Sequence, residues 1–77
     1  MQLLTQSSQL GHILRARRRA LKLSQRALAS KLGVSQNRLS EIEANPGRLP
    51  LERLLDIVNI LGFELLIQDR QATDGHW

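Results

Sequence analysis

Apolar residues recur at three- and four-residue spacing over most of the chain, which is the periodicity of helices packed on a core. The pattern predicts four helices, over about residues 8–21, 25–32, 36–43 and 50–61. In the first helix Leu10, Leu14 and Leu21 share one face, which the aliphatic stem of Arg17 or Arg18 extends. The chain is therefore expected to be mostly α-helical.

The fourth predicted helix has the most apolar sequence of the four. Spacing places five of its side chains on an inward stripe: Leu51, Leu54, Leu55, Val58 and Leu61. Ile57 and Ile60 lie off this stripe and widen the apolar surface. A small single domain rarely exposes so much apolar area, so part of this helix is expected to face another subunit.

Residues 24–43 contain two short predicted helices joined by a tight turn at Gly33-Val34-Ser35. Ser24 and Ser35 are good N-cap residues, and Gly33 suits the left-handed position after a helix. So short a turn makes the two helices cross steeply, as in a DNA-binding helix-turn-helix. The outward side of the second helix carries polar side chains that suit the base edges and phosphates of a major groove. These residues are Gln36, Asn37, Arg38, Ser40 and Glu41.

After the fourth helix, Phe63, Leu65 and Ile67 alternate along the chain as in a half-buried β-strand. A single strand leaves its backbone donors and acceptors unpaired. The same strand of a second copy, across a two-fold axis, would pair them, so the segment predicts a homodimer. The alternative is that the fourth helix continues through these residues, which Gly62 disfavours.

This reasoning divides the chain into four parts. They are a flexible arm (residues 1–8), a helix-turn-helix DNA-binding domain (9–62), a dimerisation strand (63–68) and a flexible tail (69–77). The tail ends in the only tryptophan, Trp77, which is either incidental or an anchor for the pocket of a partner protein.

Charge is distributed unevenly along the 77 residues, whose formal net charge is +4. Residues 1–50 carry nine Lys and Arg against two Glu, giving +7, and the remainder carries −3. A polyanionic partner for the front part is one interpretation, and a solvated surface is the other.

The side chains available for catalysis are few. The chain has no cysteine, and His12 and His76, its only histidines, have no nearby Ser and Asp in a triad-like arrangement. Metal-ligand spacing and a phosphate-binding glycine loop are also missing from the sequence, so we expect no enzyme activity, cofactor or metal. No apolar run approaches about 20 residues, and the first residues lack signal-peptide features, so a cytoplasmic location is expected.

Several short motifs together resemble the Cro/C1 (Xre) helix-turn-helix family. They are Leu10-Gly11, Arg15, Arg18, Leu23-Ser24-Gln25, Leu28-Ala29, Gly33-Val34-Ser35, Ile42-Glu43, Leu51, Leu54-Leu55 and Leu61-Gly62. The resemblance covers about residues 9–62 and implies a lambda-repressor-like domain of four to five helices. It also implies a structural ion pair between Arg18 and Glu43, and it makes Arg17 a departure from the usual apolar residue.

Within that family, Glu43-Ala44-Asn45-Pro46, the fourth helix, the trailing strand and the terminal Trp77 are similar to HipB-type antitoxins. The resemblance implies a homodimeric repressor of its own operon that binds a HipA-type Ser/Thr kinase toxin. Trp77 would then be the anchor for the toxin.

We expect three groups of contact residues. The base-reading residues are Gln36, Asn37, Arg38 and Glu41. The residues expected to contact the DNA backbone are Ser24, Gln25, Arg26, Ser35, Ser40 and Arg48. The dimerisation residues are Phe63, Leu65, Leu66 and Ile67.

Three other functions remain open at this point: a stand-alone repressor, a module that mainly holds a toxin, and a basic peripheral membrane or RNA binder. The last would use the segment from Arg15 to Lys22. That segment lacks aromatic interfacial anchors, and the core needs its apolar residues. Stacking platforms for RNA are also scarce, since the chain has only Phe63 and Trp77.

Overall fold

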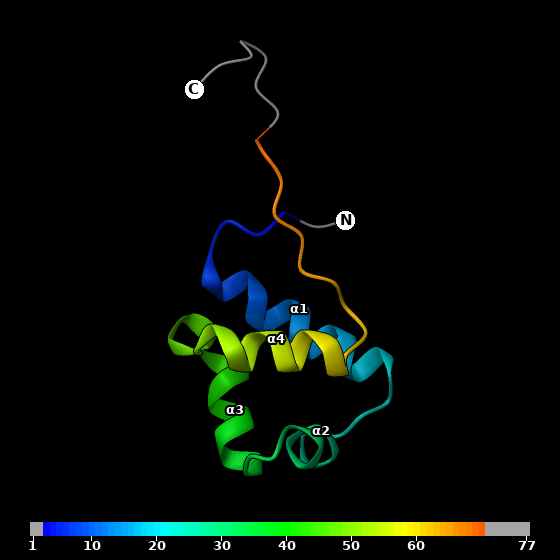
Figure 1. The fold of residues 1–77 in the computed structure, drawn as a ribbon. Coiled ribbons are helices and arrows are strands. Elements are labelled where there is room, and N and C mark those ends of the chain that lie inside the picture. Colours follow the sequence, from blue (N-terminus) through cyan, green and yellow to red (C-terminus); the bar gives the residue numbers. More distant parts are fainter. Residues whose placement is uncertain (1–2, 71–77) are drawn as a thin grey trace.

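The computed structural model describes residues 3–70, and the predicted four helices are present in them. The elements are α1 (Ser7–Ala20), α2 (Gln25–Leu32), α3 (Gln36–Ala44), the short 3-10 helix η1 (Pro46–Arg48) and α4 (Leu51–Ile60) (Figure 1). Residues 63–70 are irregular, and residues 3–70 contain no β-strand. The helical alternative for this segment is wrong, because α4 ends at Ile60.

Local hydrogen bonds explain where the helices begin. The hydroxyl oxygens of Ser24 and Ser35 accept from the backbone N–H groups of Ala27 and Arg38, each at 3.0 Å. Helix α1 begins one residue before the prediction. There the side-chain carbonyl of Gln9 accepts from the backbone N–H of Gln6 at 2.9 Å. These bonds satisfy backbone donors that the first turn of a helix leaves free.

Three helices end in a left-handed residue. Gly33 (φ +79°) follows α2 and Gly62 (φ +74°) follows α4, where glycine adopts this conformation without a Cβ clash. Lys22 (φ +58°) takes the same position after α1, although no glycine marked that end in the sequence. In each case the next backbone N–H bonds back to the helix: Leu23 to Arg18 O, Val34 to Ala29 O and Phe63 to Val58 O, at 2.9–3.0 Å.

The core lies between the four helices, and the face of α4 that it buries differs from the predicted one. Ile57 is 1% exposed, whereas Leu51 and Leu55 are 63% and 40% exposed. Ile57 and Leu61 face the core together with Val58, so the buried stripe is rotated from the predicted one. Six of the ten residues of α4, and its C-cap residue Leu61, have large apolar side chains. Hydrophobicity alone therefore allowed more than one inward face, and packing selected this one.

The predicted inward face of the first helix is also partly wrong. Leu14 is buried, but Leu21 is 42% exposed because it is the C-cap residue, beyond the last turn of the helix. Gly11 is buried where α1 passes α3, and a Cβ there would overlap the carbonyl oxygen of Glu43. The glycine therefore permits the close approach of these two helices.

Candidate nucleic-acid interface

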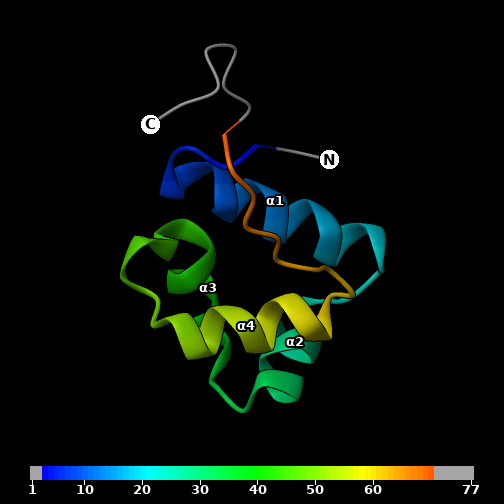
Figure 2. The same ribbon diagram turned by 45° about the horizontal axis from the view of Figure 1, so that its top comes forward.

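Helices α2 and α3 pack against each other around the short connection at residues 33–35 (Figures 1 and 2). Leu28 and Leu32 of α2 and Leu39 and Ile42 of α3 are in the same buried cluster. Because that cluster fixes which side of α3 faces inward, it also fixes the side that faces solvent.

The solvent-facing side of α3 carries all the polar residues predicted to lie there. Gln36, Asn37, Arg38, Ser40 and Glu41 are exposed. Amide side chains can bond adenine at two positions, and a guanidinium can do the same with guanine. Arg38 and Glu41 form a 3.7 Å ion pair, and their side chains are 48% and 71% exposed. An exposed pair of this kind contributes little stability, so it can open for DNA at small cost.

The start of α2 offers groups for a phosphate. Ser24 and Arg26 are exposed, and the first N–H groups of the helix have no intrahelical partner. Gln25 is half-buried, and its Nε2 donates to Glu43 Oε1 at 3.0 Å. Since this amide nitrogen carries two hydrogens, one donor is left for a phosphate oxygen. Ser35, at the start of α3, and Arg48, in η1, are also exposed.

A buried ion pair joins α1 to α3 behind this surface. Arg18 Nε donates to Glu43 Oε2 at 2.7 Å, and a second guanidinium nitrogen donates to Glu43 Oε1 at 3.3 Å. The third nitrogen of Arg18 donates to the carbonyl of Leu23 at 2.9 Å. Arg15 lies 3.6 Å from the same carboxylate, whose side chain is 1% exposed. The predicted partners are thus brought together in a fully hydrogen-bonded arrangement.

Burial raises the pKa of Glu43, but its partners reverse that effect. Hydrogen bonds from Arg18 and Gln25, together with the charges of Arg18 and Arg15, hold the pKa below its ordinary value. The carboxylate is therefore ionised at neutral pH and matches the charge of Arg18.

Two arginines make contacts that the sequence did not predict. Arg17 Nε donates to the carbonyl of Leu61 at 2.8 Å, and its guanidinium lies 5.3 Å from the centroid of the Phe63 ring. Arg53 donates to the carbonyl of Leu32 at 3.2 Å and so satisfies the end of α2. The only available signal for the first contact was the departure of Arg17 from the apolar residue usual at its position.

The predicted dimerisation residues do not share one environment. Phe63 is half-buried and packs against the core cluster. Leu65, Leu66 and Ile67 are 44%, 64% and 95% exposed. The predicted anchor Trp77 lies outside the described residues.

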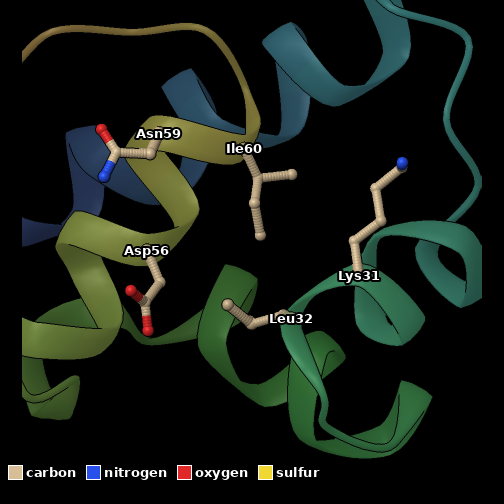
Figure 3. Close-up of a pocket in the computed structure, with 5 residues that line it drawn as sticks. All are labelled: Lys31, Leu32, Asp56, Asn59 and Ile60. Carbon is tan, nitrogen blue, oxygen red and sulfur yellow. The ribbon is translucent and has the colours of Figure 1, made fainter.

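A shallow depression lies between α2 and α4, lined by Lys31, Leu32, Asp56, Asn59 and Ile60 (Figure 3). Lys31 and Asp56 come from the two different helices, and no ion pair joins them within residues 3–70. The lining holds no hydroxyl or imidazole that could form a nucleophile–base pair. In the same residues we find no group of three potential metal ligands and no helix long and apolar enough to cross a membrane.

The helix-turn-helix family model matches residues 14–67, more than half of the chain. The chain belongs to the Cro/C1-type helix-turn-helix family. Membership in this family of DNA-binding regulators agrees with the polar, outward face of α3. No curated protein sequence matches the chain significantly.

Solved structures of HipB proteins have the same fold as this family member. A HipB–O1–O2 complex is 26% identical with a TM-score of 0.80, and the alignment covers 90% of this chain and all of that one. A HipA–HipB–O2–O3 complex and a structure described as MDT protein each show 25% identity and a TM-score of 0.82. In both cases 92% of this chain and all of the other are covered. The fold is therefore of the HipB type.

Proposed function

We propose that this chain is a homodimeric, sequence-specific repressor that binds double-stranded DNA and serves as the antitoxin of a HipA-type kinase. The observation that carries the proposal is the polar outward face of α3 on a HipB-type helix-turn-helix. The core holds α3 firmly, so this face can enter a major groove without refolding.

We assign the recognition of DNA bases to α3. The exposed polar residues that we assign to it are Gln36, Asn37, Arg38 and Glu41. Each good bidentate contact to a base gives about 1–3 kcal/mol of discrimination. The backbone contacts are assigned to the starts of α2 and α3, to Ser40 within α3 and to η1. Their residues are Ser24, Gln25, Arg26, Ser35, Ser40 and Arg48. Backbone contacts set the register of the protein on the duplex but do not read its sequence.

The second copy is expected to cover residues 63–68. Leu65, Leu66 and Ile67 leave apolar surface in solvent, and within residues 3–70 their backbone groups make no hydrogen bond to other backbone groups. Pairing across a two-fold axis would cover this apolar surface and give the backbone groups hydrogen-bond partners. The dimer would present two α3 helices about 34 Å apart to successive major grooves of a near-palindromic operator.

The kinase partner is inferred from the HipA–HipB–O2–O3 complex, to which this chain is similar over most of its length. If the kinase binds the DNA-bound dimer more tightly than the free dimer, DNA must by linkage bind the kinase-bound dimer more tightly. Trp77 is the proposed anchor on the antitoxin side.

The membrane or RNA alternative has lost its main support. An amphipathic helix on a membrane needs a free apolar face, but Leu14 of α1 is 1% exposed and Arg18 is bound to Glu43.

The test is selection of DNA fragments from a random pool by the purified protein, followed by sequencing. We expect an inverted repeat with half-sites about one helical turn apart. No enriched sequence, or binding only to vesicles, would refute the repressor assignment. Co-purification with a kinase-like protein from the same operon tests the antitoxin part. Tight operator binding without such a partner would leave a stand-alone repressor.

A further inference from the structure

Arg17 connects α1 to the point where the chain leaves α4. Its Nε donates to the carbonyl of Leu61, the C-cap residue of α4, at 2.8 Å. Its guanidinium also lies over the Phe63 ring, 5.3 Å from the centroid. A Cβ on the intervening Gly62 would lie 3.2 Å from a nitrogen of the same guanidinium. One side chain thus contacts Leu61 and Phe63 and fills the space beside the glycine between them.

Each contact has a physical reason to be favourable. The last carbonyls of a helix lack intrahelical donors and carry partial negative charge, so a cation that donates a hydrogen bond there is stabilising. A guanidinium over an aromatic face adds a cation–π attraction. Lysine could supply the charge, but it lacks the planar group that makes both contacts at once.

The position of these contacts is what gives them a role beyond α4. Phe63 is the last half-buried residue within residues 3–70, and the exposed fraction rises from 44% at Leu65 to 95% at Ile67. Figures 1 and 2 show this segment leaving the end of α4 beside the C-terminal part of α1. The direction of the segment is therefore set at Leu61–Phe63, where Arg17 binds.

We propose that Arg17 is a positioning residue for dimerisation: it holds the start of the C-terminal segment in the direction that pairing with a second copy requires. Ordering a free segment on binding costs conformational entropy, so a segment that is already directed pairs more tightly. This inference rests on the proposed homodimer. It assigns to Arg17 a function that the helix-turn-helix itself does not need.

The test compares full-length variants by sedimentation equilibrium over a dilution series. Arg17→Met keeps an unbranched apolar stem and removes the guanidinium, with its hydrogen-bond donors and its charge. We expect its dimer to dissociate about tenfold more readily than wild type, which corresponds to about 1.4 kcal/mol. Arg17→Lys should be intermediate. The matched control is Arg19→Met, an exposed position on the same helix, and its dimer should be unchanged.

Phe63→Leu is the second arm, because it keeps an apolar group against the core and removes only the aromatic face. It should weaken the dimer, and the Arg17→Met/Phe63→Leu double variant should lose less than the two single losses combined. Hydrogen exchange separates this role from a general loss of stability. We expect faster exchange after Gly62 while the amides of α2 and α3 stay protected.

Dimer constants of Arg17→Met and Phe63→Leu equal to wild type would overturn the inference and leave the homodimer standing. Equal loss of protection throughout α2 and α3 would also overturn it, because Arg17 would then be a residue of general stability. A wild-type chain that remains monomeric over the whole series would refute the homodimer, and the inference with it.

Discussion

Glu43→Gln should destabilise the domain more than any other single change of charge on α3. The substitution keeps the size of the side chain but leaves Arg18, which is 7% exposed, without a counter-ion. Removing one member of a buried ion pair costs about 3–5 kcal/mol. The glutamine oxygen can still accept one hydrogen bond, and Arg18 keeps its bond to Leu23 O, so we expect the lower end, about 3 kcal/mol.

This loss is large for so small a domain, whose total stability is typically about 5–15 kcal/mol. Urea unfolding should show a lower midpoint with an unchanged slope. Glu41→Gln is the control on the same helix. Its side chain is 71% exposed and lies 3.7 Å from Arg38, so it should cost less than about 0.5 kcal/mol. If Glu43→Gln were as mild as this control, the buried pair would not stabilise the native fold as argued.

The same pair predicts a pH dependence. Because the pKa of Glu43 is lowered in the folded protein, its contribution is fully present above the unfolded value of about 4.3. The contribution is lost as the pH falls through the folded value. Wild type should therefore lose stability on acidification below about pH 4.3, and Glu43→Gln should lose less over the same interval. Parallel curves for the two proteins would contradict this assignment.

Three further predictions concern other parts of the molecule. Lys22→Gly should raise the free energy of unfolding by about 0.5–1 kcal/mol, since the lysine holds φ +58°; an unchanged urea midpoint would argue against strain there. Gly11→Ala should lower the free energy of unfolding by about 1–3 kcal/mol, because the new Cβ would overlap Glu43 O; a rise from better helix propensity would show that α1 can shift. In DNA titrations, Arg26→Ala should weaken specific and random DNA about equally and reduce the salt dependence, whereas Gln36→Ala should mainly reduce the preference for operator. Equal losses on both DNAs for Gln36→Ala would remove it from the base-reading set.

The sequence by itself determined the starts of α2 and α3 and the outward face of α3, because these depend on interactions over short distances. Ser24 and Ser35 each accept from a backbone N–H three residues later, so the cap and its partner lie in the same stretch of sequence. The polar side of α3 followed equally directly, since Leu39 and Ile42 leave only one apolar side to bury.

Tertiary structure alone decided which face of α4 is buried and what Arg17 of α1 contacts. Either choice of stripe on α4 buries several large apolar side chains, so only the shape of the surrounding core selects Ile57 over Leu51 and Leu55. Arg17 donates to a carbonyl 44 residues away, and no local pattern encodes a partner at that separation. Pairing of residues 63–68 depends on backbone groups of another copy, so it is decided at a level above the single chain.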